Sequence, residues 1–167
     1  QPSIVMVAIG TNDAYGFAGV NTPARNSVDY QVIMDKIFND LTQNLPDTSV
    51  FIMGMTTPLK KYIDIAGLGW AVPFQQEFLD TQFEEYNSVL KDLAQQYGYV
   101  YVDIRSKWPK DIEGSWAFYA DGIHPSDAGN DKMMEILYSA LRSTVVHPTS
   151  VKSRYKLTTT WGMMKSR

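Results

Sequence analysis

Two short peptides contain the residue types that acyl-transfer chemistry needs. Residues 10–13, Gly-Thr-Asn-Asp, follow an apolar run of strand length, and residues 121–125, Asp-Gly-Ile-His-Pro, precede an amphipathic stretch. An asparagine amide at the end of a strand can donate a hydrogen bond to a developing oxyanion. A carboxylate three residues before a histidine can hold the imidazole in one tautomer and stabilise its protonated form. The two peptides therefore predict an oxyanion site and a general base.

The second peptide contains the predicted acid–base pair. We expect His124 to take a proton from a hydroxyl nucleophile and to return it to the leaving alcohol. Asp121 is predicted to orient the ring of His124, and Pro125 biases His124 away from helical backbone angles. The alternatives are a surface-loop imidazole at His124 and an ordinary Asp-Gly turn at Asp121. Neither alternative explains the three-residue offset between the carboxylate and the imidazole.

The first peptide contains the predicted oxyanion donor. Asn12 is predicted to donate its side-chain amide, and its alternative is a loop asparagine bonded to the backbone. Gly10 is expected to allow an unusual backbone angle or a close approach. Asp13 is expected to organise this loop by accepting backbone N–H bonds, without taking part in the chemistry.

These peptides resemble two blocks of the SGNH (GDSL-type) hydrolases. That family has a Gly-Asp-Ser nucleophile block, a Gly block, a Gly-x-Asn-Asp block and an Asp-x-x-His block, in this order. Residues 10–13 match the third block and residues 121–124 match the last. The resemblance covers about residues 3–143 and corresponds to the later part of the family domain. The resemblance implies a serine esterase that hydrolyses carboxylic esters and needs no cofactor. The expected reaction is deacetylation, or removal of short acyl groups, from carbohydrate or lipid esters.

The nucleophile of this chemistry is unknown. The sequence contains no Gly-Asp-Ser, and its one Gly-Ser pair, at Ser115, lies on the wrong side of the motif order. Ser3 would lie at the start of its strand, opposite the expected site. A segment with the serine can be cleaved, lost or supplied by another chain, or the nucleophile can lie outside the resemblance. A further alternative is a non-catalytic binding or assembly module that kept the scaffold.

Composition excludes several other classes. The chain has 167 residues, of which 44% are hydrophobic and 20% charged, with a net charge of -3. This balance argues against nucleic acid as a partner. The family resemblance implies a small-molecule ester as the substrate. There is no cysteine, and two histidines are too few to suggest a structural zinc, so no metal site is expected. No apolar run reaches the roughly 18 residues of a membrane span. The family resemblance weakly favours a secreted or extracytoplasmic location.

Strands and helices alternate in the predicted element order. Apolar runs at residues 4–9, 50–55 and 99–104 predict strands, with the first buried on both faces. Helices are predicted at residues 27–45, from 74 or 80 to 97, and after Ser126, whereas residues 10–25, 56–73 and 106–120 are predicted to be loops. This alternation predicts an α/β fold with a parallel sheet, whose ligands bind at the carboxyl ends of the strands. Together with the resemblance, it suggests a three-layer αβα, flavodoxin-like domain that lacks its first strands.

The domain is expected to cover residues 1–147 and to be incomplete at its N-terminus. Residues 148–167 form a basic tail, either an added strand or a disordered extension, and His147 beside it is not expected to be a site residue. A sheet without its first strands would leave apolar surface uncovered. We therefore expect either a homodimer or a missing N-terminal segment that completes the sheet.

Side-chain periodicity predicts which residues form the core. The helix that ends at residue 97 is expected to bury one stripe, and the first helix another. Several loop aromatics can equally line a pocket or pack against the core, and six methionines are expected to fill the core. The stripe of the helix that ends at residue 97 is Phe83, Tyr86, Leu90, Leu93, Ala94 and Tyr97, and that of the first helix is Ile33, Ile37, Leu41 and Leu45. The loop aromatics are Tyr15, Phe17, Trp70, Trp116 and Phe118. The methionines are Met6, Met34, Met53, Met55, Met133 and Met134.

Overall fold

A parallel sheet with helices on both faces forms the framework of the molecule. The computed structural model of the chain describes residues 2–15, 26–59, 61, 76–109 and 112–146. The elements, in chain order, are β1 (Ile4–Val7), α1 (Thr11–Tyr15), α2 (Ser27–Asn44), β2 (Ser49–Met53), α4 (Gln76–Tyr97), β3 (Val100–Val102), η1 (Arg105–Lys107), α5 (Ile112–Trp116) and α6 (Asp127–Val146).

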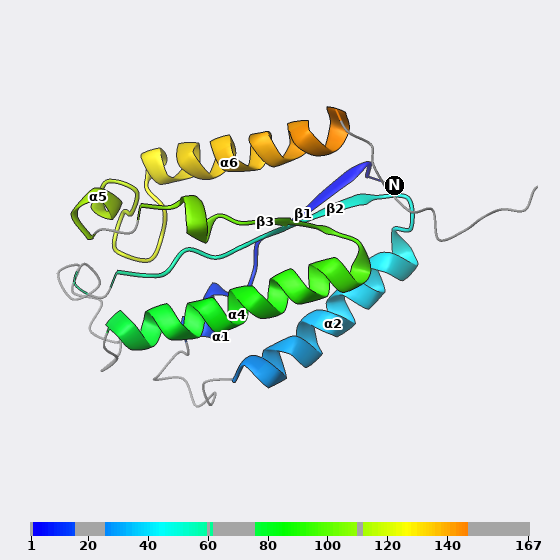
Figure 1. Cartoon of the computed structure of the whole chain (residues 1–167), viewed down its shortest axis with the longest axis horizontal. Coiled ribbons are helices and arrows are strands. Elements are labelled where there is room, and N and C mark those ends of the chain that lie inside the picture. The colour runs from blue at the N-terminus through cyan, green and yellow to red at the C-terminus, as the bar shows by residue number, and fades with distance from the viewer. Residues whose placement is uncertain (1, 16–25, 60, 62–75, 110–111, 147–167) are drawn as a thin grey trace, which may run out of the picture.

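The sheet has the order β1-β2-β3, and both strand pairs are parallel. Helices α2 and α4 lie on one face of the sheet and α6 lies on the other, which gives three layers (Figure 1). The predicted α/β class with a parallel sheet is therefore confirmed. Because all three strands run the same way, the residues that follow them meet at one edge of the sheet.

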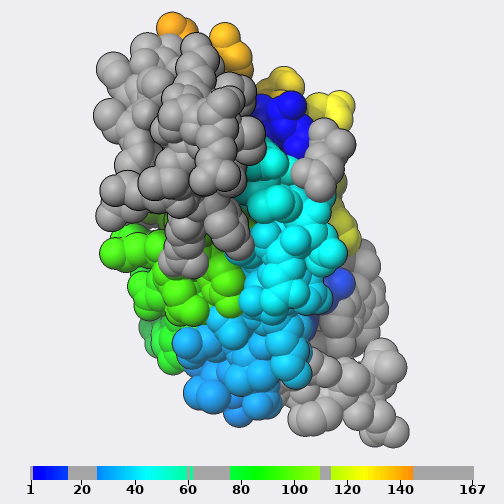
Figure 2. All heavy atoms as spheres, turned by 90° about the vertical axis from the view of Figure 1, so that its right-hand side faces the viewer, coloured from blue at the N-terminus to red at the C-terminus, as the bar shows by residue number. Residues whose placement is uncertain are grey.

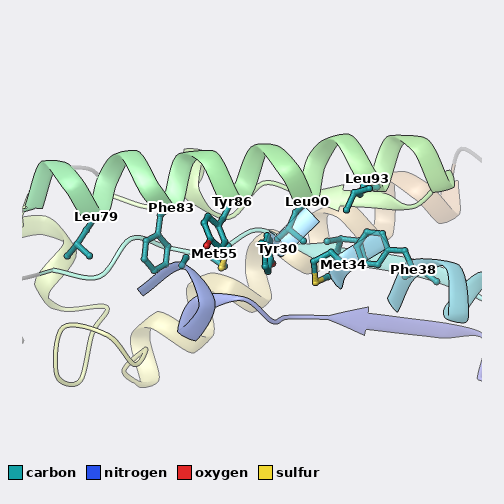
Figure 3. Close-up of a cluster of buried hydrophobic side chains, with 13 residues drawn as sticks. Tyr30, Met34, Phe38, Met55, Leu79, Phe83, Tyr86, Leu90 and Leu93 are labelled. Atoms are coloured by element: carbon teal, nitrogen blue, oxygen red, sulfur yellow. The ribbon is translucent and has the colours of Figure 1, made fainter. Parts of the chain in front are cut away.

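The larger core lies between the sheet and helices α2 and α4. The predicted stripe of α4 faces it, and Phe83, Tyr86, Leu90, Leu93 and Ala94 are all buried, as expected from helical periodicity. Figure 3 shows the labelled side chains of this stripe pointing from α4 toward Tyr30, Met34 and Phe38 of α2. The helix ends before Gly98, whose φ of 71° gives the left-handed C-terminal stop expected there.

The second core lies between the sheet and α6. Ile136 and Leu137 of α6 pack with Phe51 of β2 and Val102 of β3. The hydroxyl of Ser126 accepts a hydrogen bond from the Gly129 N–H at 3.2 Å, so the predicted N-cap of this helix is confirmed.

The buried face of α2 differs from the prediction by one position. Tyr30, Met34 and Phe38 are buried, whereas Ile37 and Leu41 are only partly buried at the margin of the core. The aromatic and methionine side chains of α2 are larger than its isoleucine and leucine side chains and bury more area when they face the core. The side chain of Asn26, just before this helix, accepts from the Asp29 N–H at 2.8 Å and so caps its first turn.

Strand β1 is not buried on both faces, which corrects the sequence prediction. Ile4 and Met6 are 43% and 52% exposed, and Met134 on α6 is 56% exposed, so Met6 and Met134 are not core residues. Met6 pairs in register with Phe51 and therefore faces the α6 side of the sheet. Figure 2 shows atoms of the first residues, in dark blue, at the surface beside α6.

Several predicted loops contain short helices. Residues 11–15 form α1, and the stretch predicted as loop at 106–120 contains part of η1 and all of α5. The strands are shorter than their apolar runs, because the last residues of each run already belong to the connecting loops. The connection at 62–75, Phe17, Trp70, His147 and the tail at 148–167 lie outside the described residues. Within the described helices, none is both long and apolar enough to cross a membrane.

Candidate active site

The predicted acid–base pair is formed in the structure. Asp121 Oδ2 lies 2.7 Å from Nδ1 of His124, and Asp121 Oδ1 accepts hydrogen bonds from the backbone N–H groups of His124 (2.8 Å) and Ile123 (3.0 Å). The side chain of His124 is 70% exposed, whereas that of Asp121 is 28% exposed. The carboxylate therefore engages Nδ1 and leaves Nε2 on the exposed side of the ring, which is the arrangement that a general base requires.

The same contacts determine the charge of Asp121. Partial burial raises the pKa of this carboxyl, but the hydrogen bonds from the His124 backbone, the His124 ring and the Ile123 backbone outweigh burial, so the pKa lies below its ordinary value of 3.8. Asp121 is consequently ionised at neutral pH and can stabilise an imidazolium without taking its proton.

A small antiparallel bridge closes the loop that carries this pair. Tyr119 and Pro125 form the bridge, and the Ala120 N–H donates to the His124 carbonyl at 2.8 Å. The Ser126 N–H donates to the Phe118 carbonyl at 3.0 Å. The loop is thus tied at its base just before α6 begins, so the position of His124 depends on the segments that hold this base.

The predicted oxyanion peptide follows β1. Gly10 has a φ of 114°, the unusual backbone angle expected for it, and a Cβ there would collide with the hydroxyl of the buried Tyr30 and lie 3.1 Å from Met55 Sδ. The side chain of Asn12 is exposed on α1. Asp13 is half-buried in the first turn of α1, and its charge adds to burial in raising the pKa of Tyr30. The catalytic roles of Asn12 and Gly10 stay predictions.

The two peptides are linked through the residues that follow β2. The Leu59 N–H donates to the Gly122 carbonyl at 2.8 Å, within the acid–base loop. Ile123 packs against the hydrophobic cluster that contains Ala14 of α1 and Met55. The segments after β1, after β2 and before α6 therefore meet at the carboxyl edge of the sheet.

The serines considered from the sequence do not provide an obvious nucleophile. Ser115 is 2% exposed, and its hydroxyl donates to the Pro109 carbonyl. Ser3 precedes β1 and so lies at the amino end of the strand, opposite Gly10. Among the predicted pocket aromatics, Trp116 is 40% exposed, and Phe118 packs on Trp108 with ring centroids 5.5 Å apart.

A separate polar cavity of about 510 Å³ lies beside β3, between α4 and the η1–α5 segment. Its lining includes Glu84, Tyr101, Arg105 and Trp108, but none of the predicted catalytic residues. Arg105 and Glu84 form an ion pair at 3.0 Å across it. The described residues contain no group of three or more His, Asp or Glu side chains that could hold a metal ion.

Sequence reasoning missed the polar residues that hold these segments together. Asn87 on α4 is buried among apolar neighbours and is hydrogen-bonded to the backbone of Met55, while the hydroxyl of Tyr119 donates to the Thr57 carbonyl. Burial raises the pKa of Tyr119 to about 12, so its hydroxyl remains a donor at neutral pH. An asparagine within an otherwise apolar helical stripe was the available signal for Asn87.

Comparison with solved structures supports the fold. A candidate GDSL-like lipase from Parabacteroides merdae is 16% identical, with a TM-score of 0.67 over 83% of this chain and 60% of that one. A GDSL-like lipase from Bacteroides thetaiotaomicron is 18% identical, with a TM-score of 0.61 over 86% of this chain and 63% of that one. A mutant of an acetylxylan esterase from Geobacillus stearothermophilus is 16% identical, with a TM-score of 0.62 over 84% of this chain and 59% of that one.

The chain thus spans about 60% of the length of these solved structures. No curated protein shows a significant sequence match. The profile of the GDSL-like lipase/acylhydrolase family matches residues 1–132, which is most of the chain and includes both predicted site peptides. The chain therefore belongs to the GDSL-like lipase/acylhydrolase family.

Proposed function

We propose that this chain provides the oxyanion donor and the acid–base pair of an ester hydrolase. The observation that carries the proposal is the 2.7 Å contact between Asp121 Oδ2 and His124 Nδ1, combined with a largely exposed imidazole. The link from Leu59 to Gly122 supports it, because it joins this loop to the edge of the sheet where Asn12 follows β1.

The proposed reaction is a two-step acyl transfer. His124 Nε2 takes the proton of a serine hydroxyl as the serine Oγ bonds to the ester carbonyl carbon, and Asn12 and the Gly10 N–H donate to the resulting oxyanion. The bond to the alcohol oxygen then breaks as His124 returns the proton to that oxygen. Water repeats the sequence on the acyl-serine and releases the carboxylic acid, while Asp121 stays ionised throughout.

We further propose that the serine comes from polypeptide that completes the sheet beside β1. One edge of β1 pairs with β2, and Ile4 and Met6 are exposed on the strand. A strand placed along the other edge would lie next to the segment of residues 10–13 and could present a serine at the carboxyl end of the sheet. Either a missing N-terminal segment or a second copy of the chain could provide that strand.

The proposed substrates are small acyl esters, above all acetyl groups on carbohydrates, or short-chain lipid esters. The family membership supports ester substrates, and the structural neighbour described as an acetylxylan esterase supports acetylated carbohydrate.

Hydrolysis of two acetyl esters tests this function. Free imidazole cleaves activated esters such as p-nitrophenyl acetate, so an acetylated xylo-oligosaccharide is assayed in parallel. We expect His124→Ala to lower both rates by at least about 10²-fold and Asn12→Ala to lower kcat by roughly 10²–10³-fold. His147→Ala, the same change at the other histidine, should leave both rates unaltered. Ester hydrolysis by the unmodified chain that persists at the same rate in the His124→Ala variant would contradict the proposal.

A non-catalytic binding module is the second candidate, and the burial of Ser115 favours it. Labelling with a fluorophosphonate followed by peptide mapping separates the two. A labelled serine whose reactivity depends on His124 supports the hydrolase. An unlabelled chain that binds the acetylated oligosaccharide without cleaving it supports the binding module.

A further inference from the structure

Residues 54–59, which we call the linking segment, contact both halves of the proposed active site. At one end, Met55 lies against Gly10, and at the other end the Leu59 N–H donates to the Gly122 carbonyl at 2.8 Å. Between them, the Thr57 carbonyl accepts a hydrogen bond of 2.7 Å from the hydroxyl of Tyr119. The segment thus spans from the predicted oxyanion peptide to the loop of the acid–base pair.

The buried side chain of Asn87 clamps the start of this segment. Its Oδ1 accepts from the Met55 N–H at 2.7 Å, and its Nδ2 donates to the Met55 carbonyl at 3.0 Å. Asn87 is 5% exposed, and Tyr101 also donates to its Oδ1. A buried side-chain amide that hydrogen-bonds both the backbone N–H and the backbone carbonyl of one residue fixes that residue, as the backbone of a neighbouring strand does in a sheet.

The hydroxyl of Tyr119 holds the middle of the linking segment, at the Thr57 carbonyl. Tyr119 is 4% exposed and forms the bridge with Pro125 at the base of the acid–base loop. Its hydroxyl and the Gly122 carbonyl are two separate attachment points between this loop and the linking segment. Loss of either would leave a buried polar group without its partner, which favours local opening of the loop.

We propose that Asn87 and Tyr119 are positioning residues that, through the linking segment, set the position of the Asp121–His124 pair relative to residues 10–13. This inference rests on the proposed function for its catalytic meaning. It does not need the nucleophile, because both contacts lie within this chain. Neither residue is expected to touch the ester.

Amide hydrogen exchange of the full chain tests the positioning without any activity measurement. Tyr119→Phe removes only the hydroxyl and keeps the ring against Trp108. We expect exchange at the Leu59 and His124 amides to accelerate roughly tenfold, which is the effect of one lost hydrogen bond of about 1.4 kcal/mol. Unchanged exchange at both amides would overturn the proposal.

Tyr99→Phe is the matched control. The Tyr99 hydroxyl also donates to a backbone carbonyl, that of Phe38, at 2.9 Å, but it lies at the amino end of β3, away from the site. This variant should leave exchange at Leu59 and His124 within about twofold. An equal acceleration in Tyr99→Phe and Tyr119→Phe would show general loosening and would also overturn the proposal.

Asn87→Leu tests transmission along the linking segment. The change removes the clamp on Met55, and we expect faster exchange at Leu59 and His124, although neither amide contacts Asn87. If the variant does not fold, Asn87→Asp retains an acceptor for the Met55 N–H but places a second carboxyl oxygen against the Met55 carbonyl, so faster exchange at both amides is expected there too. No change at either distant amide in a folded variant would exclude Asn87 as a positioning residue.

Kinetics separates this inference from the proposed function. If the chain hydrolyses esters, Tyr119→Phe should lower kcat about fivefold to tenfold with little change in KM, because the pair is displaced without loss of ester contacts. A loss in KM alone would contradict positioning. If exchange accelerates as expected while ester hydrolysis is the same with and without the His124→Ala change, the positioning is supported and the proposed function fails.

Discussion

At the scale of single residues, the acid–base pair depends on one carboxylate that makes several contacts. Asp121 accepts two backbone N–H bonds with one oxygen and contacts the His124 ring with the other. The local turn alone can produce this geometry, since all partners lie within three residues. The imidazole is therefore oriented before any other part of the site is considered.

The depressed pKa of Asp121 predicts a pH-dependent contribution to stability. A carboxyl whose pKa is lower in the folded state stabilises the protein above its unfolded pKa of about 3.8, and this contribution is lost as pH falls through the folded value. Asp121→Asn should therefore cost about 1 kcal/mol of unfolding free energy at pH 7 and less at pH 2.5. Urea unfolding at both pH values measures the difference, and a difference that widens on acidification would contradict the prediction.

Gly10 combines a left-handed backbone with a close approach of buried side chains. Gly10→Ala should lower the free energy of unfolding by roughly 2–4 kcal/mol, because of backbone strain and the collision with Tyr30 and Met55. Gly98→Ala is the control for strain alone, since φ is 71° and a Cβ there meets nothing within 4 Å. It should cost about 1 kcal/mol. Equal costs in urea unfolding would show that the close approach at Gly10 is unimportant.

At the scale of elements, α4 contributes to both the core and the site. Its apolar stripe covers one face of the sheet, and Asn87 on the same face fixes the linking segment. The helix therefore connects global stability to the geometry of the carboxyl edge. Substitutions on its buried face should affect both properties, whereas those on its exposed face should affect neither.

Two phenylalanines of α4 test this distinction. Phe83 is fully buried and Phe78 is 46% exposed. Phe83→Ala should lower the free energy of unfolding by about 3–5 kcal/mol, and Phe78→Ala by about 0.5 kcal/mol. Chemical denaturation of the two variants gives the comparison, and similar losses would mean that the packing of α4 is not as described.

At the scale of the whole molecule, the helices cover the two faces of the sheet unequally. Helices α2 and α4 cover one face, whereas Ile4 and Met6 of β1 are exposed, as are Met134 and Tyr138 of α6. In the described sheet β1 is an edge strand with exposed apolar side chains, and such an edge favours pairing with further polypeptide. This is the surface where we propose that the sheet is completed.

Self-association through this edge is a measurable consequence. We expect the chain to associate as its concentration rises, and Met6→Lys to shift it toward monomer because a charge would be buried in the contact. Val28→Lys makes a similar change at a 66% exposed residue of α2 and should leave the association unaltered. Sedimentation velocity over a range of concentrations is the measurement. Association that is the same in both variants would place the contact elsewhere.

The sequence by itself determined the local features of this protein. The α/β class, the stripe of α4, the cap at Ser126 and the Asp121–His124 pair all follow from periodicity or from residues close in the chain. These interactions are short-range, so their geometry is encoded within a few turns of backbone. The two family motifs are likewise short, since each lies within five consecutive residues.

Only the tertiary structure decided how these parts meet. The contacts of Asn87 with Met55 and of Tyr119 with Thr57 join residues that are 32 and 62 positions apart in the chain. The exposed face of β1 and the one-position shift in the buried face of α2 likewise depend on which elements pack against them. Hydrophobic periodicity states that a face is apolar, but it does not state what covers that face. The position of His124 relative to Asn12 is of this second kind, because it is set by the packing of three separate segments at one edge of the sheet.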